Sequence, residues 1–405
     1  MTSETVKFPN ESGQVLQGQL HRPLLSPVAT VLFAHCFTCT ASIKAARVIA
    51  DALVRRGFAV LRFDFTGLGR SEGEFPETNF STNVSDLVAA ADYLAAQHQA
   101  PAVLVGHSLG GTAVLAAAPQ IASSRAVVTI NAPAEAKHIL HLLGDSRDRL
   151  EADGSAMVNI GGTPFEIRKQ FVDDLERQEL PGAVRRLRRA LLVMQSPVDS
   201  IVTIDNATEI FRHALHPKSF ISLDDADHLL SRESDAIYAG DALAAWASRY
   251  VSLAAEEDES DAAAEAAIAR TGNEGFLTEL MAGGHQLLAD EPASVGGTNA
   301  GPSPYDLLSG ALASCTSMTL QMYARHKGIA LDNAIVHVTH EKIHAKDCES
   351  CETREGKIDQ FVRTIELQGD LTDEVRTRML EIADKCPVHR TLKGEIEIVT
   401  KAASR

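Results

Sequence analysis

Short apolar runs alternate with Ala- and Leu-rich helical stretches over the first two thirds of the chain. Six of these runs have the length and the β-branched character of strands that are buried on both faces, at Ala29–Ala34, Ala59–Phe63, Ala102–Gly106, Ala126–Asn131, Ala190–Gln195 and Lys218–Leu223. Helical patterns lie between them, at Ser42–Arg56, Asn83–Gln97, Gly111–Ala122 and Thr203–Leu215. This alternation predicts an α/β fold with a doubly wound parallel sheet. The stretch Glu135–Arg188 lacks clear strand signals and fits a cap inserted between two strands.

The order of the elements changes in the last third of the chain, where strands with alternating polarity accompany a few helices. The pattern predicts a hairpin from Ile268–Leu280 and His285–Ala289, helices at Pro304–His326 and Asp373–Lys385, and strands at Ala334–Ile343, Phe361–Gln368 and Glu395–Thr400. We therefore expect a second, α+β domain.

An acidic, Ala-rich segment separates the two patterns. Residues 252–265 contain no large apolar residue after Leu253, so the segment cannot bury a face and is typical of a linker. We predict one domain at residues 1–252, a linker at 253–263 and a second domain at 264–405. The sequence shows no repeat with a period of 20–50 residues, which argues against a solenoid.

Charge and hydropathy narrow the class of partner. The net charge of −16 argues against nucleic acid or an anionic membrane as a partner. No apolar run reaches the roughly 18 residues that a membrane-spanning helix needs. The N-terminus has no basic start followed by an apolar stretch, so we expect no secretory signal and a cytoplasmic location.

A nucleophile motif follows the third of the predicted buried strands. In Val103-Leu-Val-Gly-His-Ser-Leu-Gly-Gly111, a strand leads into Gly-x-Ser-x-Gly and then a helix of small residues. Glycines at positions 106 and 110 relieve the crowding of a sharp strand–helix turn. The turn places Ser108 at a helix N-terminus, where backbone N–H groups favour developing negative charge.

Partners for this serine follow in the order Asp, then His. Asp199 comes after the strand that begins at Leu191, and His228 follows the strand Ser219–Leu223. An imidazole at a strand end can accept the serine proton, and a neighbouring carboxylate can hold its tautomer. Three other acids are rivals for the carboxylate role, namely Asp205, Asp225 and Asp227.

Residues 28–250 resemble an α/β-hydrolase of the serine aminopeptidase-like group, on the motif around Ser108 and on Ala34-His-Cys-Phe-Thr38 after the first buried strand. The resemblance implies an oxyanion hole built from the backbone N–H groups of Phe37 and Leu109. Cys36 stands where many relatives have Gly, and its larger side chain is expected to narrow the oxyanion region. Since we expect a cytoplasmic location for a chain of this length, we expect its six cysteines to be thiols with redox, metal or packing roles rather than a disulfide scaffold.

Residues 264–403 resemble the OsmC/Ohr family, on Gly301-Pro-Ser-Pro-Tyr-Asp-Leu-Leu308, Ala313-Ser-Cys-Thr-Ser-Met-Thr-Leu320 and Ala383-Asp-Lys-Cys-Pro-Val-His389. The resemblance implies an intertwined homodimer that reduces organic hydroperoxides. By position, Cys315 matches the thiol that attacks the peroxide and Cys386 the thiol that resolves the sulfenic acid. A thiol reductant of the lipoyl type is also implied, and no cofactor.

The resemblance is weaker for the groups that activate the thiol. Family members use an Arg and a Glu, but Asn273 occupies the best match to the Arg, with Arg270 close by. The acidic position falls near Asp306, beside Tyr305. Arg270 and Asp306 are therefore the candidates for thiol activation, since a nearby cation lowers a thiol pKa.

A second cysteine pair lies in His340-Glu-Lys-Ile-His-Ala-Lys-Asp-Cys-Glu-Ser-Cys-Glu352. Cys348 and Cys351 have the spacing of a zinc or redox pair, with His340 and His344 as further ligands, but a functionally silent loop is the favoured interpretation. We predict no metal site.

These observations favour a bifunctional enzyme. Its first domain would hydrolyse a small ester, thioester or amide, and its second would reduce organic hydroperoxides. An alternative keeps the hydrolase but makes the second domain a ligand-binding and dimerising module without peroxidase activity.

Overall fold

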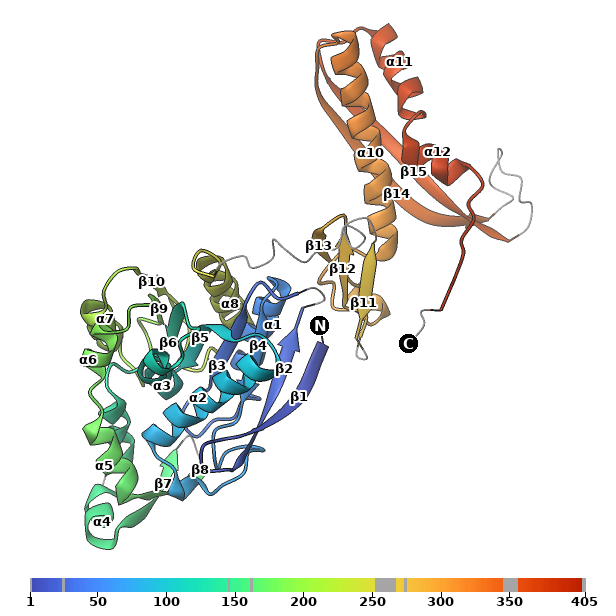
Figure 1. Ribbon diagram of the computed structural model, residues 1–405. Coiled ribbons are helices and arrows are strands. Elements are labelled where there is room, and N and C mark those ends of the chain that lie inside the picture. Colours follow the sequence, from blue (N-terminus) through green and yellow to red (C-terminus); the bar gives the residue numbers. More distant parts are fainter. Residues whose placement is uncertain are drawn as a thin grey trace. The chain divides into compact units, whose positions relative to one another are not determined.

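A computed structural model describes residues 2–23, 26–144, 146–160, 163–251, 267–272, 275–344 and 356–402 (Figure 1). Contacts divide the chain into two compact units, Met1–Glu265 and Ala266–Arg405. The linker proposed at residues 253–263 lies outside the described residues. Within the described parts of the chain, no helix is both long and apolar enough to cross a membrane.

The first unit is built on an eight-stranded mixed sheet with the order β1-β2-β4-β3-β5-β6-β9-β10. Its strands are β1 (Thr2–Pro9), β2 (Val15–Arg22), β3 (Thr30–Ala34), β4 (Ala59–Phe63), β5 (Pro101–His107), β6 (Ala126–Ile130), β9 (Ala190–Gln195) and β10 (Lys218–Ser222). The six strands from β4 to β10 in this order pair in parallel, as the continuous apolar runs predict.

Helices cover both faces of this sheet and bury a separate apolar cluster on each. One face carries α1 (Lys44–Arg55) and α8 (Glu233–Ala247); the other carries α2 (Phe80–Gln97), α3 (Leu109–Ala117) and α7 (Ile204–His213). The short 3-10 turns η1 (Phe75–Glu77) and η2 (Ala118–Gln120) complete the second face. The fold is therefore the predicted doubly wound α/β-hydrolase sheet.

The antiparallel edge of the sheet and the cap contain strands that the sequence pattern did not indicate. β1 and β2 form an antiparallel hairpin that pairs with β4, and burial along β2 alternates residue by residue. Only one face of this hairpin is buried, so it lacks a continuous apolar run. The cap consists of η3 (Ala136–Leu143), α4 (Ser146–Asp153), β7 (Ser155–Ile160), β8 (Thr163–Arg168), α5 (Lys169–Arg177) and α6 (Leu180–Arg185), with β7 and β8 paired antiparallel.

The second unit is α+β, as predicted. It contains the three-stranded sheet β11 (Ile268–Thr271), β12 (Thr278–Ala282) and β13 (His285–Ala289), the turn η4 (Ala293–Val295), the helices α10 (Pro304–Lys327), α11 (Asp373–Ala383) and α12 (Pro387–Lys393), and the hairpin β14 (Leu331–His344) with β15 (Lys357–Gly369). The first predicted strand of this region is thus two strands. Its small core gathers where α10 and α11 meet β14 and β15, around Leu320, Leu331, Leu367 and Met379.

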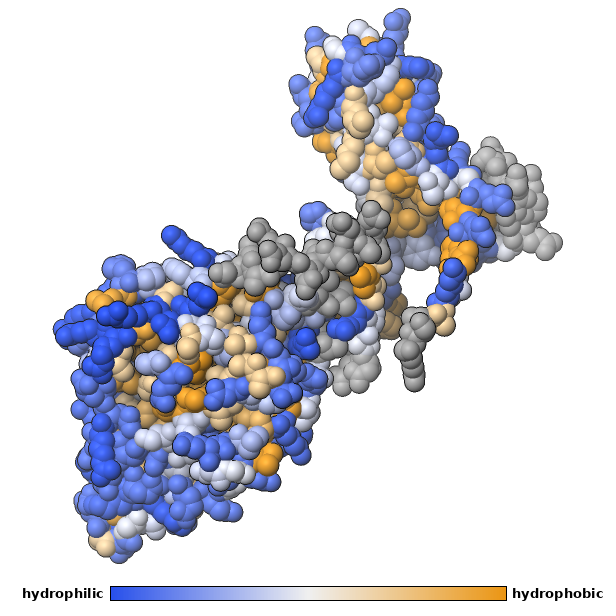
Figure 2. Space-filling model, in the orientation of Figure 1, coloured by the Kyte–Doolittle hydropathy of each residue, from blue (hydrophilic) through white to orange (hydrophobic). Residues whose placement is uncertain are grey.

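The strand predicted at Glu395–Thr400 does not form. These residues have no regular structure, and Ile396, Ile398 and Val399 are 53%, 86% and 65% exposed. Their alternating polarity is that of a strand, but a strand needs a neighbour that supplies hydrogen bonds. Apolar side chains are also exposed on α10, where Met318 and Met322 are 65% and 69% accessible. Figure 2 shows apolar side chains gathered on this unit, along α10 and on the C-terminal segment.

Candidate active site

Ser108 lies at the sharp turn between β5 and α3. Its φ of 55° is in the left-handed region, which a non-glycine residue adopts only under constraint. The turn is closely packed: a Cβ on Gly106 would lie 2.2 Å from the carbonyl oxygen of Gly110. A Cβ on Gly110 would lie 2.4 Å from the carbonyl oxygen of His35 at the end of β3. Glycine at both positions therefore brings the nucleophile turn against the neighbouring strand end.

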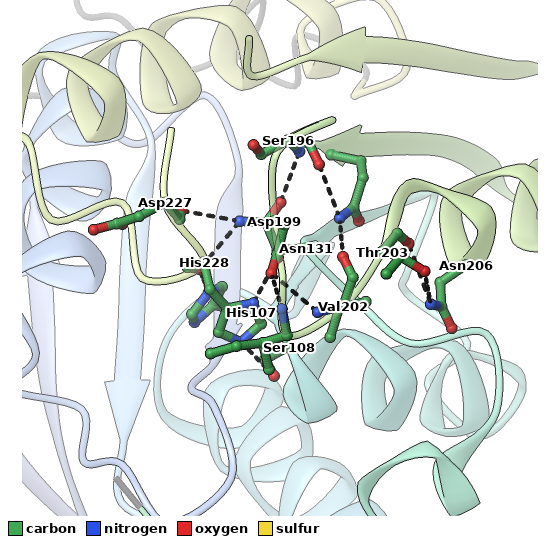
Figure 3. A network of polar contacts seen from close by, with 12 residues as sticks. His107, Ser108, Asn131, Ser196, Asp199, Val202, Thr203, Asn206, Asp227 and His228 are labelled. Carbon is green, nitrogen blue, oxygen red and sulfur yellow. Dashed lines mark hydrogen bonds and ion pairs between the residues drawn. The ribbon is translucent and has the colours of Figure 1, made fainter. Parts of the chain in front are cut away.

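The three predicted partners lie in hydrogen-bond contact (Figure 3). His228 Nε2 is 3.1 Å from Ser108 Oγ, and His228 Nδ1 is 2.7 Å from Asp199 Oδ2. All three side chains are buried or nearly so. They come from loops at the carboxyl ends of β5, β9 and β10, which share one edge of the sheet.

Asp199 is held as a carboxylate. Burial opposes its ionisation, but hydrogen bonds from His228 and from the backbone N–H groups of Val202 and Ile201 outweigh burial and lower the pKa of Asp199. Asp199 Oδ1 accepts from Ile201 N at 2.8 Å and from Val202 N at 3.0 Å, which leaves Oδ2 for the imidazole. This arrangement orients the ring with its Nε2 toward the serine.

The rival acids are engaged elsewhere. Asp225 forms a bidentate ion pair with Arg232, at 2.8 and 2.9 Å. Asp227 Oδ1 accepts from the backbone N–H of Ser231 at 2.8 Å. Asp205 lies exposed in the first turn of α7.

Two further polar side chains, which sequence reasoning missed, hold the backbone of His228 in place. His107 Nε2 lies 2.7 Å from the carbonyl oxygen of His228, and Asn131 Nδ2 donates to the same oxygen at 3.1 Å. Burial and the neighbouring His228 lower the pKa of His107 to about 4, so its ring is neutral and Nε2 carries the donated proton. The Gly-His-Ser motif contained His107, but a contact across 121 residues leaves no signal in local spacing.

The two predicted oxyanion donors lie on facing segments. Leu109 is the first residue of α3, so its N–H has no acceptor within the helix. Phe37 lies in the turn after β3, and no acceptor for its N–H occurs among the described residues. Phe37 and Leu109 line the same cleft.

Cys36 and Cys39, expected to be thiols, form a disulfide in the turn that carries Phe37. Their spacing allowed this pairing, but the expectation followed from the assumed compartment rather than from the local geometry. Cys36 is buried and Cys39 is partly exposed. The Cys36 side chain is therefore part of a cross-linked turn and not a free thiol.

The cleft beside the oxyanion donors is aromatic and narrow. Only about 20 Å³ of it admits the centre of a water molecule. Its apolar walls come from the turn after β3, from η1 and from the cap, chiefly Phe37, Phe65, Phe75 and Phe171. The Phe37 ring stacks on Phe171 of the cap with a centroid separation of 5.3 Å. Among the described residues, none of the three partners lines this cleft or a much larger hollow with many charged side chains between the cap and α7. Leu109 and Gly110, which follow Ser108 directly in the chain, line the narrow cleft, so we assign the chemistry to it.

The second unit brings Cys315 and Cys386 together. Cys315 lies in the middle of α10 and Cys386 lies between α11 and α12, and the two side chains are close enough for each to affect the pKa of the other. Cys386 is fully buried, whereas Cys315 is partly exposed. Cys315 is therefore the sulfur that a small molecule can reach.

The two thiols influence each other's ionisation. Burial opposes ionisation of both sulfur atoms and is the largest cause acting on the pKa of each. Hydrogen bonds from the N–H of His389 and from Thr316 act in the opposite direction on the pKa of Cys386.

An arginine that sequence reasoning missed contacts the segment between α11 and α12 that carries Cys386. Arg363 of β15 donates to Thr316 Oγ1 at 3.1 Å, to the carbonyl oxygen of Ala383 at 3.0 Å and to Asp384 at 2.6 Å. It thus ties α10 to the segment that carries Cys386. Its position in an alternating strand gave no indication of this contact.

The structure places the two predicted activating residues in β11 and at the start of α10. Arg270 is in β11, opposite Glu279 of β12. Asp306 forms a capping box with Ser303 at the start of α10, where hydrogen bonds from Ser303 lower the pKa of Asp306. It is nine residues from Cys315, or about 13 Å along the helix.

Cys348 and Cys351 lie outside the described residues. Within the described ranges, no group of three or more His, Cys, Asp or Glu side chains could hold a metal ion. His340, a suggested ligand, is 2.8 Å from Asp359 and stacks on Tyr305.

Two family profiles match the chain. One, described as alpha/beta hydrolase family, matches residues 31–295, and the other, described as OsmC-like protein, matches residues 297–401. The first match extends past the end of the first compact unit, although the contacts of β11–β13 assign these strands to the second. No curated protein matches the sequence.

Solved structures similar to the chain align with its first unit. The esterase domain from a Rhodothermus marinus protein is 48% identical, covers 62% of this chain and 100% of its own, and has a TM-score of 0.52. Est1E from Butyrivibrio proteoclasticus, solved with ferulic acid bound, is 18% identical, covers 59% of this chain and 97% of its own, and has a TM-score of 0.53. The second similarity concerns the fold alone.

Proposed function

The chain belongs to the alpha/beta hydrolase family and carries an OsmC-like domain C-terminal to the hydrolase domain. We propose that its first unit is a serine hydrolase of small acyl esters, thioesters or amides. The observation that carries the proposal is the continuous contact Ser108–His228–Asp199 at one edge of the sheet. The 48% identity to an esterase domain supports ester hydrolysis in particular.

In this mechanism Ser108 Oγ attacks the acyl carbon while His228 Nε2 takes its proton. Asp199 stabilises the imidazolium that forms, and the N–H groups of Phe37 and Leu109 stabilise the oxyanion. The imidazolium then donates its proton to the leaving group. Water, activated in turn by His228, releases the acid from the acyl-enzyme. His107 and Asn131 hold the backbone of His228 throughout this cycle.

The narrow cleft favours a short acyl group. Pockets for small-molecule ligands are usually about 300–1,000 Å³, whereas the accessible part of this cleft is far smaller. A longer acyl chain must displace the Phe37–Phe171 stack. We therefore expect acetyl and propionyl esters to be cleaved faster than octanoyl esters.

Covalent labelling with a fluorophosphonate tests the nucleophile. Ser108→Ala should abolish both labelling and p-nitrophenyl acetate hydrolysis, with a loss of more than about 10³-fold. Ser234→Ala, which alters an exposed serine of α8, is the matched control and should behave as the unaltered protein. Persistent hydrolysis by the Ser108→Ala protein would refute the assignment.

For the second unit, we propose reduction of organic hydroperoxides. The Cys315 thiolate would attack the peroxide oxygen, releasing the alcohol and leaving a sulfenic acid; Cys386 would then condense with it, releasing water and forming a disulfide. A dithiol of the lipoyl type, by resemblance, would supply two electrons to restore the thiols. The proximity of the two thiols, each of which affects the pKa of the other, supports this reading over that of a binding module.

Mass mapping after treatment with cumene hydroperoxide tests the thiol chemistry. A 315–386 link is expected, and Cys386→Ser should instead trap a sulfenic acid on Cys315. If Cys348 and Cys351 pair while Cys315 stays reduced, the redox centre is the other cysteine pair. If no thiol responds, the domain is a binding module.

We also propose that the second unit forms a homodimer. Support comes from the exposed apolar residues of α10 and from the segment 395–400, which has the polarity of a strand without a neighbour. A second copy of the chain could supply that neighbour. Light scattering should give a dimer for the full chain and a monomer for a fragment that ends at residue 251.

A further inference from the structure

The turn that carries the first oxyanion donor is closed by a disulfide. Cys36-Phe37-Thr38-Cys39 begins two residues after the end of β3, and the N–H of Cys39 donates to the carbonyl oxygen of Cys36 at 3.2 Å. The cross-link therefore joins the first and last residues of a four-residue turn. Phe37, between them, lines the cleft and carries the N–H that we assign to the oxyanion hole.

Thr38 makes this turn unfavourable by itself. Its φ of 59° is in the left-handed region. Turns with a left-handed third residue prefer Gly or Asn there, and a β-branched residue is a poor substitute. Such conformations persist only where their surroundings enforce them. The Thr38 hydroxyl donates to the carbonyl oxygen of Phe37 at 2.7 Å, which is a contact within the turn.

The chain on either side of the turn is anchored independently of the disulfide. Upstream, His35 is buried, and its Nδ1 lies 2.8 Å from the carbonyl oxygen of Cys36, which belongs to the same planar peptide group as the Phe37 N–H. Downstream, the N–H of Ala41 donates to Asp64 Oδ1 at 2.7 Å. Loss of the disulfide would therefore leave this peptide group held by hydrogen bonds alone, without unfolding the strand or helix α1.

From these observations we propose that the Cys36–Cys39 disulfide positions the Phe37 N–H for the oxyanion, so that hydrolysis depends on the oxidation state of this pair. The inference rests on the proposed serine hydrolase. The two cysteines are positioning residues, since they act on the reacting atoms only through Phe37. With the disulfide open, Thr38 can relax to a negative φ, and the turn can accommodate this change by rotating the Cys36–Phe37 peptide group against its hydrogen bond to His35, so that the Phe37 N–H turns away.

A dithiol can open the cross-link from the exposed side. Its thiolate attacks Cys39 Sγ, which is partly exposed, and the buried Cys36 sulfur leaves and takes a proton. The second thiol of the reductant then attacks the mixed disulfide, releasing Cys39 as a thiol and the reductant as its own disulfide. The reverse reaction needs a two-electron oxidant, and an organic hydroperoxide can serve as one. One thiol attacks the peroxide and becomes a sulfenic acid as the alcohol leaves. The other thiol then condenses with the sulfenic acid, and water leaves as the disulfide forms.

The experiment compares the oxidised and reduced full-length protein. All variants carry Cys315→Ser, Cys348→Ser, Cys351→Ser and Cys386→Ser, so that only the turn responds to reductant. Hydrolysis of p-nitrophenyl acetate is measured before and after dithiothreitol, and alkylation with mass mapping reports the state of the pair. Loss of one oxyanion donor costs about 10²–10³ in kcat, so we expect kcat to fall about 10- to 100-fold on reduction with little change in KM.

Two variants separate positioning from a general structural role. Cys36→Ser with Cys39→Ser should have the low kcat of the reduced protein and should not respond to dithiothreitol. Thr38→Gly should lose much less activity on reduction, because glycine adopts the left-handed turn without a cross-link. Loosening of the whole fold would not be rescued by this single change, and thermal melting of each protein monitors the fold.

The proposal is overturned if the reduced protein, with both thiols alkylated, retains its kcat, or if Thr38→Gly loses as much activity as the parent. If the oxidised protein neither labels with fluorophosphonate nor hydrolyses any ester, the proposed serine hydrolase fails instead.

Discussion

The two units of this chain differ in how far their candidate catalytic groups and their apolar side chains are buried. In the first, helices cover both faces of the sheet, and the groups around Ser108 are buried and hydrogen-bonded to one another. In the second, a small core holds α10 against one hairpin, while Met318, Met322 and the segment 395–400 remain exposed.

This difference concerns what a single chain can supply. A doubly wound sheet brings strand ends from distant parts of the sequence to one edge, so serine, histidine and acid meet without a partner. The thiol unit brings its two cysteines together, and Asp306, one of the residues predicted to activate them, caps α10. We infer that one chain supplies every group of the proposed hydrolase site, whereas Asp306 lies about 13 Å from Cys315 along α10.

The largest expected effect tests the completeness of the hydrolase site. Asp199→Asn keeps the shape of the carboxylate but favours the wrong imidazole tautomer, so kcat should fall about 10⁴-fold. Asp225→Asn is the matched control, because Asp225 pairs with Arg232 and not with His228. Steady-state ester hydrolysis measures both. A severe loss in the control with little loss in Asp199→Asn would reassign the acid.

Acid should destabilise the first unit more than the second. Burial holds His107 neutral, with a pKa of about 4 against 6.5 when exposed. Between these values the unfolded chain binds more protons, so the stability that His107 contributes is complete above pH 6.5 and is lost as the pH falls toward 4. A shift of this size corresponds to about 3 kcal/mol, and the buried His21 and His35 act in the same direction.

Calorimetry of the full chain from pH 7.5 to 4.5 measures this effect. We expect the transition of the first unit to move to lower temperature as the pH falls, and His107→Gln to reduce the pH dependence. Equal sensitivity of His107→Gln and the parent would exclude His107 as a source of the effect.

The contrast also explains what could be predicted from the sequence. Strands such as Ala126–Asn131 are continuous apolar runs because both faces of the sheet are covered, and the nucleophile turn needs glycines at fixed offsets. The hairpin at residues 2–22 buries one face only, so its signal is weaker. His107, Asn131 and Arg363 act through contacts between residues far apart in the chain, and local spacing carries no information about them.

The segment 395–400 shows the opposite case. Its alternating pattern is correct for a strand, but a pattern specifies only which faces are apolar, and not whether a neighbouring edge exists in the same chain. The Cys36–Cys39 pair differs again. Its residues and spacing were visible, and only the prior that intracellular cysteines are thiols argued against a disulfide.

An effect of intermediate size is expected from Arg363, which ties α10 to the segment that carries Cys386. Arg363→Met removes the hydrogen bonds that tie α10 to Ala383 and Asp384, and should lower the free energy of unfolding of the second unit by about 2 kcal/mol. It should also slow formation of the 315–386 disulfide, because the two thiols would no longer be held close together. Arg378→Met, on the exposed side of α11, is the control and should have a smaller effect on both. Chemical denaturation and quenched mass mapping measure the two quantities.

The smallest expected effect separates two roles for Asp306. Within one chain it caps α10 together with Ser303, whereas the resemblance to the peroxidases gives it a role in activating the thiol. Ser303→Ala and Asp306→Asn both disrupt the capping box, and each should lower the free energy of unfolding by about 1 kcal/mol. If capping is the whole role of Asp306, the two variants should also oxidise Cys315 at the same rate in cumene hydroperoxide. A slower rate in Asp306→Asn alone would mean that the Asp306 carboxylate reaches a thiol. Because Asp306 lies about 13 Å along α10 from Cys315 of the same chain, that thiol would then belong to the partner subunit.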